Sequence, residues 1–388
     1  MNDSESVAML QMLVETPSVS RLERPAVERL REWATRAGLT AGIDESGSFV
    51  AASHGDPLRT GSDADIVLLG HIDTVPGYVP IRREGDLLYG RGSVDAKGPL
   101  AAFVAAASRL RSRLPDGVRV VVVGAVEEEI ATSRGARAAV RRYRPRACVI
   151  GEPSGAEAVT LGYKGRLLCR ARAVRSVVHT AGPGHSVADE IHAWWTRVLT
   201  GVAGMNDGRE GAFGVVQATL RSVETGSDGL VDRAEAVAGF RLPPGVEPGV
   251  MESACRAAAL GAVELEFMGA ESAWVGDRGA DLVRALTTSI RASGHTPRLL
   301  TKTGTSDMNV VGPVWGRALG GPAGGGSAEC VASIAAYGPG DSSLDHTPIE
   351  HISLAEFARG IGVLERGILG LAAEWTEKAP NVLQRAGV

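Results

Sequence analysis

The stretch VVVGAVEEEIATSRGA, residues 121–136, begins as an apolar run and then places Glu127, Glu128 and Glu129 side by side. The apolar run, which extends back to residue 118 and is interrupted only by Arg119, predicts a strand that is buried on both faces, as in a parallel sheet. Three adjacent carboxylates at the end of such a strand repel one another and lower the stability of a compact site. The stretch therefore indicates a fold class and raises the question of what compensates its charge.

Similar apolar runs alternate with helical patterns on both sides of this stretch. Strands are predicted at 65–70, 118–126, 147–151 and 333–338, and helices at 26–38 and 98–114. This alternation is typical of an α/β fold with a mostly parallel sheet and helices on both faces.

The middle of the chain has a different pattern. The segment GRLLCRARAVRSVVHTA, from residue 165, alternates polar and apolar residues, which predicts a strand with one solvated face. A helical stretch at 189–199 and two further strand-like segments follow. We therefore predict an inserted α+β domain at 165–275, within a catalytic domain formed by residues 1–164 and 276–388.

Composition narrows the class of protein. The net charge of −4 does not indicate a nucleic-acid-binding protein, and the one locally basic segment, RRYRPR at 141–146, is more simply a solvated helix end and loop. No apolar run has the ~20 residues that a membrane span needs, and the N-terminus does not resemble a signal peptide. The four cysteines are scattered and read as reduced core thiols, namely Cys148, Cys169, Cys255 and Cys330. We expect a cytoplasmic protein with no membrane partner.

Potential metal ligands follow the predicted strands or precede the helix at 98–114. They are His71, Asp73, Asp95, the glutamates at 127–129, Glu152 and His346. Because the carboxyl ends of parallel strands meet at one edge of a sheet, these side chains should converge. Any one of them alone is more simply a turn or core residue. Together they would leave several buried carboxylates unpaired, and a shared pair of cations removes that cost.

The residue types indicate which cations these are. Two histidines and three carboxylates suit two borderline divalent ions such as Zn²⁺, with one carboxylate bridging, and Co²⁺ as a substitute. Asp73, two residues after His71, can fix the tautomer of that imidazole. Such a two-metal site polarises a carbonyl and activates water, which points to a hydrolase.

Four motifs at these positions resemble the M20 metallopeptidase and amidohydrolase family. They are GHIDTVPG (70–77), LYGRGSVDAKG (88–98), VEEE (126–129) and GEPS (151–154). The resemblance implies a di-zinc catalytic domain with an inserted lid domain that also mediates homodimerisation. It further implies a cis peptide bond after Asp95.

Carried over by position, the resemblance assigns the metal ligands and the base. One metal is held by His71, Asp95 and Glu152, and the second by Asp95, Glu129 and His346. Glu128 is then the general base that deprotonates the attacking water, and Glu127 flanks it. An alternative register, with Glu127 as the base and Glu128 as the ligand, stays open.

Three further segments are similar to hydrolases that release lysine or ornithine from the C-terminal glutamate of a small acidic amino-group carrier protein. They are LGYKGR (161–166), TKTGTSDMN (301–309) and AYGPGDSSLDHTPIEH (336–351). Such a substrate presents carboxylates near the scissile amide, and charged or backbone donors could bind them. The candidate donors are Arg166, Lys302, Gly304, Thr305 and Ser306. Arg166 could equally be a solvated residue of a strand face.

The segment VVHTAGP (177–183) resembles the lid segment of the family. There a histidine, here His179, stabilises the oxyanion in the active site of the partner subunit. The sequence thus predicts a zinc-dependent amide hydrolase that releases lysine, ornithine or a related diamino acid from a carrier protein. A deacylase of a small substrate, such as N-acetylornithine or N-succinyl-diaminopimelate, is the alternative. A catalytically inactive metal-binding homologue is the alternative outside the enzymes.

Overall fold

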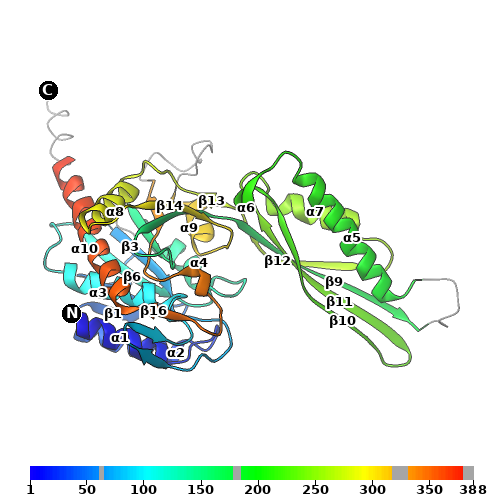
Figure 1. Ribbon diagram of the computed structural model, residues 1–388, viewed down its shortest axis with the longest axis horizontal. Helices are drawn as coiled ribbons and strands as arrows, with labels where there is room; N and C mark the ends of the chain where they lie inside the picture. Colours follow the sequence, from blue (N-terminus) through cyan, green and yellow to red (C-terminus); the bar gives the residue numbers. More distant parts are fainter. Residues whose placement is uncertain (61–64, 178–184, 317–330, 379–388) are drawn as a thin grey trace. The chain divides into compact units, whose positions relative to one another are not determined.

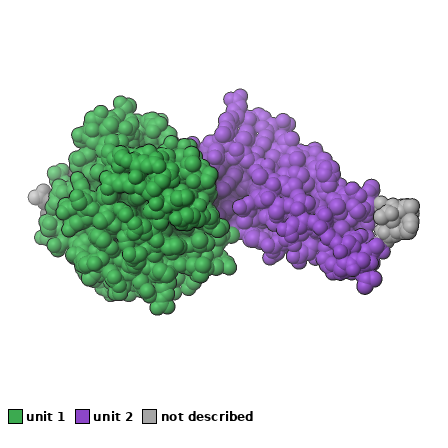
Figure 2. Space-filling model, turned by 60° about the horizontal axis from the view of Figure 1, so that its bottom comes forward, with its two compact units in different colours: residues 1–162, 275–300, 306–388 green, residues 163–274, 301–305 purple. Residues whose placement is uncertain are grey.

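The computed structural model describes residues 1–60, 65–177, 185–316 and 331–378. The chain divides into two compact units, which Figure 2 shows in different colours. Unit 1 comprises residues 1–162, 275–300 and 306–388, and unit 2 comprises residues 163–274 and 301–305. The inserted domain was predicted at 165–275; the main segment of unit 2 is 163–274, and the unit also contains the short segment 301–305.

Within the described residues, a large sheet is formed by nine strands. They are β1 Thr40–Ile43, β2 Phe49–Ala52, β3 Asp65–His71, β6 Arg119–Ala125, β7 Ala147–Gly151, β8 Ala158–Tyr163, β13 Trp274–Val275, β14 Arg298–Lys302 and β15 Ser333–Ala336. The order is β1-β2-β6-β3-β7-β15-β8-β13, and β14 pairs with β8. The pairs β3–β6, β3–β7 and β15–β7 are parallel, whereas β1–β2, β2–β6 and β15–β8 are antiparallel. The middle of the sheet is therefore parallel, and its strands end at one edge.

Helices of unit 1 surround this sheet (Figure 1). They are α1 Asp3–Glu15, α2 Arg24–Arg36, α3 Lys97–Leu110, α4 Arg134–Arg142, α8 Asp281–Ala292, α9 Met308–Trp315 and α10 Leu354–Lys378. Helix α3 packs on β3 and β6, and α4 also packs on β6. Val122 belongs to the same buried core cluster as Leu100 of α3, and its neighbours Val121 and Val123, which alternate with it along the strand, are equally buried. Both faces are covered, which explains why β6 is apolar throughout after Arg119.

A second, three-stranded sheet of unit 1 connects two loops that are distant in sequence. Its strands are β4 Arg82–Glu84, β5 Leu87–Tyr89 and β16 His351–Ser353, in the order β16-β5-β4. The pairing of β16 with β5 is antiparallel, with His351 opposite Tyr89. This pairing places the chain that follows Tyr89 beside the chain that precedes His351.

Unit 2 contains one antiparallel sheet and helices α5 Val187–Met205, α6 Gly211–Gly214 and α7 Pro248–Ala258. The strands are β9 Gly165–Ser176, β10 Gln217–Ser227, β11 Val231–Leu242 and β12 Glu264–Glu271, in the order β10-β11-β9-β12. On β9, Leu167 and Cys169 are buried in a core shared with α5 and α7. The alternate residues, such as Arg172, lie on the open face. This is the alternation that the sequence of β9 predicted.

The α/β fold with a mostly parallel sheet is confirmed. The predicted helix at 98–114 is α3, which ends four residues earlier, at Leu110. Cys148, Cys169 and Cys255 are buried free thiols, and Cys330 lies outside the described residues. Of the helices in the described part of the chain, none combines the length and the apolar character needed to span a bilayer.

Candidate metal centre

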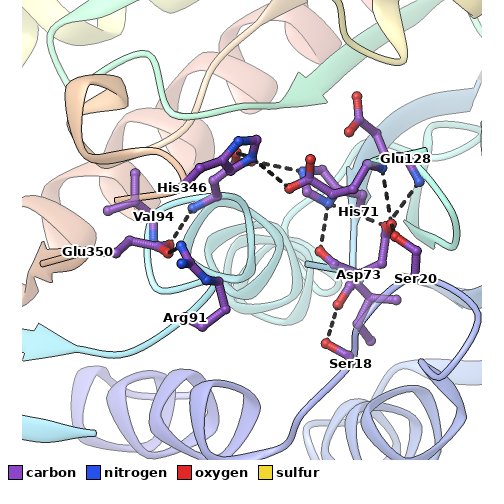
Figure 3. A network of polar contacts seen from close by, with 12 residues as sticks. Ser18, Ser20, His71, Asp73, Arg91, Val94, Glu128, His346 and Glu350 are labelled. Atoms are coloured by element: carbon purple, nitrogen blue, oxygen red, sulfur yellow. Dashed lines mark hydrogen bonds and ion pairs between the residues drawn. The ribbon is translucent and has the colours of Figure 1, made fainter. Parts of the chain in front are cut away.

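His71 is the last residue of β3, which lies between β6 and β7 at the centre of the sheet. Its side chain is 2% exposed, and Nδ1 lies 3.0 Å from the backbone oxygen of Asp73 (Figure 3). A carbonyl oxygen only accepts, so Nδ1 carries the proton and Nε2 is free to bind a cation. Nε2 lies 3.1 Å from Oδ1 of Asp95. Two electron-rich atoms at this distance require a proton or a metal ion near them.

Asp95 lies between two histidines. Oδ1 faces Nε2 of His71 at 3.1 Å, and Oδ2 faces Nε2 of His346 at 2.9 Å. The two oxygens thus point to different partners, which is the arrangement of a bridging carboxylate. The peptide bond between Asp95 and Ala96 is cis, as the resemblance implied.

Potential ligand atoms gather in two groups that share Asp95. The atoms of each group lie within 4.8 Å of one another, and the groups are His71, Asp95 and Glu152, and Asp95, Glu129 and His346. These are the residues that the sequence proposed as ligands. The donors are imidazole nitrogens and carboxylate oxygens, a set that suits two borderline divalent ions with one shared carboxylate. The residues therefore fit a two-metal centre.

The three glutamates after β6 have different surroundings. Oε1 of Glu129 lies 3.1 Å from Nε2 of His346, whereas Glu127 accepts a hydrogen bond from Thr132 and pairs with Arg134 at 3.5 Å. Glu128 belongs to neither group of ligand atoms. This geometry favours Glu129 over Glu128 as the ligand, and the roles themselves stay predictions.

Gly135 brings helix α4 close to the end of β6. Its N–H donates to the backbone oxygen of Val126 at 3.0 Å, and an added Cβ would lie 2.5 Å from the nitrogen of Val126. Any larger residue would push the helix away from the strand. The glycine of the opening stretch therefore fixes the turn that carries the three glutamates.

Burial and neighbouring charges shift the pKa values of the centre. Burial raises the pKa of Glu128 well above its usual value, and the charges of Glu152 and Glu129 add to this effect. Burial and the charge of Asp95 likewise raise the pKa of Glu129. Hydrogen bonds to Asp95 and Glu129 raise the pKa of His346 to about 10. In the metal-free protein, the raised pKa values mean that Glu128, Glu129 and His346 bind protons more strongly, and these protons offset the negative charge of the buried carboxylates.

The carboxylate of Asp73 is 0% exposed and holds the glutamate turn by its backbone. Oδ1 accepts from the N–H of Glu128 and Oδ2 from the N–H of Glu129, both at 3.1 Å. Oδ2 also accepts from the hydroxyl of Ser20 at 2.7 Å. Burial acts to raise the pKa of Asp73, but the hydrogen bond with His71 and the other donors lower it. Asp73 therefore stays ionised and orients both a histidine and the glutamate turn.

Most of the proposed substrate-binding residues lie in unit 2. Thr305 donates from Oγ1 to the backbone oxygen of Lys164 at 2.9 Å, and the N–H of Lys164 donates to the backbone oxygen of Lys302 at 3.2 Å. Oγ1 of Thr305 also accepts from Arg241 at 2.7 Å, and Arg241 lies opposite Arg166 in the pairing of β11 with β9. The structure thus brings Arg166, Lys302 and Thr305 into one region.

Arg241 is a residue of this region that the sequence reasoning missed. It lies near the end of β11, in the sequence FRLPPG (240–245), but its place opposite Arg166 depends on a register that the sequence does not show. Gly304 lies beside Thr305 in the chain. Ser306 belongs to unit 1, where its Oγ accepts from the N–H of Met308 at 3.2 Å at the start of α9. His179 lies outside the described residues.

A model of the peptidase family M20/M25/M40 matches residues 67–369. The chain belongs to this family. A LysW-lysine hydrolase of Deinococcus radiodurans is 43% identical over 368 residues, which cover 94% of this chain and 96% of that protein. A putative LysW-lysine/LysW-ornithine hydrolase of Pyrococcus abyssi is 35% identical over 375 residues, or 96% of both chains.

Solved structures of the M20 family share the fold. The metallo-carboxypeptidase Sso-CP2 of Sulfolobus solfataricus has a TM-score of 0.73 at 17% identity and covers 96% of this chain and 100% of its own. The YXEP protein of Bacillus subtilis, described as a dinuclear metal-binding peptidase, has a TM-score of 0.60 at 14% identity and covers 95% and 98%. As an M20 family member, the chain is a metal-dependent hydrolase of amide bonds.

Proposed function

We propose that this M20 hydrolase uses two Zn²⁺ ions, held by the two ligand groups that share Asp95. The observation that carries the proposal is the division of the Asp95 carboxylate between His71 and His346, at 3.1 and 2.9 Å. Glu152 completes one group and Glu129 the other. When bound, the two ions polarise the amide carbonyl and acidify the attacking water.

Glu128 is the proposed general base. It follows β6 beside Glu129 but lies in neither ligand group, and its backbone is fixed by Asp73. Its pKa is raised by burial, so its carboxylate has a stronger affinity for a proton than an exposed glutamate. Glu128 takes a proton from the attacking water and passes it to the leaving amine. Glu127, held by Thr132, keeps the turn in place.

For the substrate, we propose an amino-group carrier protein whose C-terminal glutamate is linked to lysine, ornithine or a related diamino acid. Support comes from the names of the two relatives described above and from the extent of their similarity. A substrate of this kind presents free carboxylates, and Arg166, Arg241 and Lys302 provide positive charge in one region of unit 2. We propose Gly304, Thr305 and Ser306 as further contacts with the substrate.

The proposal also includes the assembly and its location. The resemblance to the family suggests a homodimer in which His179 of the partner subunit stabilises the oxyanion. The buried free thiols of Cys148, Cys169 and Cys255 are compatible with the reducing conditions of the cytoplasm.

A substrate comparison tests the proposed function. The zinc-loaded protein is incubated with carrier protein carrying lysine or ornithine on its terminal glutamate, with N-acetylornithine and with N-succinyl-diaminopimelate. Mass spectrometry of the released amino acid should show turnover of the carrier conjugates. If the amino acid were released only from N-acetylornithine or N-succinyl-diaminopimelate, the proposed carrier-protein substrate would be wrong and the enzyme would be a deacylase of small substrates. A protein that hydrolyses none of them would contradict the proposed activity.

A further inference from the structure

A second buried carboxylate repeats the arrangement of Asp73. Both carboxylates follow a histidine of the centre closely in the chain: Glu350 lies four residues after His346, and Asp73 lies two residues after His71. It is 0% exposed, and its Oε1 accepts from the N–H of Val94 at 3.0 Å and from the N–H of Asp95 at 3.1 Å (Figure 3). Each carboxylate thus follows a histidine of the centre and binds two consecutive backbone N–H groups of another ligand loop.

The second oxygen of Glu350 also has a partner. Oε2 accepts from Nη1 of Arg91 at 2.7 Å, and the side chain of Arg91 is 15% exposed. The backbone oxygen of Glu350 accepts from the N–H of Gly90 at 3.2 Å. Glu350 is therefore attached to the segment 90–95 by its backbone and by both carboxylate oxygens. A buried carboxylate is stable only when its charge and lone pairs are matched in this way.

Another carboxylate shows what a purely structural role looks like. Oε1 of Glu356 also accepts from two backbone N–H groups, those of Ala156 at 2.9 Å and Gly340 at 3.1 Å. Neither donor belongs to a ligand residue of the centre. Glu350, in contrast, binds the N–H of Asp95 itself, so any loosening of this bond moves the shared ligand.

We propose that Glu350, supported by Arg91, is a positioning residue that orients Asp95 for binding two metal ions. Its hydrogen bonds fix the backbone from which the Asp95 carboxylate reaches His71 and His346. Each histidine-bearing segment then holds the loop of one acidic ligand. Asp73 holds the loop of Glu129, and Glu350 holds the loop of Asp95. The inference rests on the proposed two-metal function.

The test compares Glu350→Gln with Glu356→Gln as the matched control. Glutamine keeps an oxygen for the two N–H groups, but its amide nitrogen cannot accept from Arg91 and the charge pair is lost. We expect Glu350→Gln to bind Zn²⁺ about 10- to 100-fold more weakly in competition with a chromogenic chelator. Its kcat should fall with KM unchanged, and the visible spectrum of its Co²⁺ form should differ from that of wild type. Glu356→Gln should match wild type in all of these.

Three outcomes decide between the proposals. If the wild-type protein does not bind two Zn²⁺ ions, the proposed function fails whatever Glu350 does. If the wild type binds them and Glu350→Gln binds them as tightly as Glu356→Gln, the positioning role is wrong. If Glu350→Gln does not fold, as judged by circular dichroism, Arg91→Met decides, because it keeps Glu350 and removes one partner. Arg91→Met should then bind Zn²⁺ more weakly, and wild-type affinity would overturn the inference.

Discussion

Charged side chains gather both at the metal centre and on the open face of the sheet in unit 2, but only the sheet balances its charges. There Arg170 lies 3.1 Å from Glu235 and 2.9 Å from Glu266, and Arg172 lies 2.7 Å from Glu235. All of these side chains are about a third exposed or more. At the centre, the buried or partly buried carboxylates outnumber the two histidines.

Paired charges on the sheet contribute to the stability of the fold, whereas the excess carboxylates at the centre are suited to binding metal ions. Exposed ion pairs are solvated and contribute about 0–1 kcal/mol each. Buried carboxylates in excess are costly unless positive charge reaches them. Substitutions at the centre should therefore change metal binding and turnover, whereas those on the sheet should change stability slightly and leave turnover intact.

The largest effect is expected for Glu128→Gln. Because glutamine cannot carry the proton, kcat should fall by about 10²–10⁴-fold, as for the loss of a general base. Metal content, measured by mass spectrometry of the native protein, should stay at the wild-type level. Glu129→Gln is the paired variant and should lose metal. If Glu128→Gln lost metal and Glu129→Gln kept it, the alternative register would be correct.

The residues of the centre could be predicted because their signals are local. An apolar run locates each strand, and a ligand-type side chain follows the strand or lies in a glycine-rich loop, as with His71 and Glu152. Parallel pairing then brings these ends together without any knowledge of the loops. The order of the strands within the sheet, in contrast, was not predicted, because it depends on pairings between segments that are distant in the sequence.

Residues that act through strand register or backbone contacts were not predictable. Arg241 meets Arg166 only through the pairing of β11 with β9. Glu350 binds the backbone of Val94 and Asp95, and a backbone N–H leaves no mark in the sequence. The one signal that could have found Glu350 is its position four residues after His346, and the sequence analysis did not single it out.

A smaller effect is expected from pH in the metal-free protein. The pKa of His346 rises from 6.5 to about 10 in the folded state, because Asp95 and Glu129 accept hydrogen bonds from it. Its stabilising contribution is therefore complete below pH 6.5 and is lost as the pH rises through about 10. Urea unfolding across this range should show a steeper loss of stability in the wild type than in His346→Asn. Parallel curves for the two proteins would contradict this assignment, and bound metal should remove the difference because it displaces the proton.

The smallest effect is expected for substitutions on the open face of the unit 2 sheet. There the sign of the change in the free energy of unfolding is a sharper test than its size. Glu235 pairs with Arg170 and Arg172, but its neighbour across the β10–β11 pairing is Glu224, a like charge. Glu235→Gln should lower the free energy of unfolding by at most about 1 kcal/mol, since it loses ion pairs and gains relief from Glu224. Glu224→Gln removes the repulsion from Glu235 and should raise the free energy of unfolding slightly.

Salt dependence and turnover serve as controls for these two variants. Both changes in stability should shrink at high salt, because salt screens exposed charges. The kcat should stay unchanged, because neither residue belongs to the centre. A loss of turnover in either variant would show that the open face takes part in function, and the contrast between the two regions would then fail.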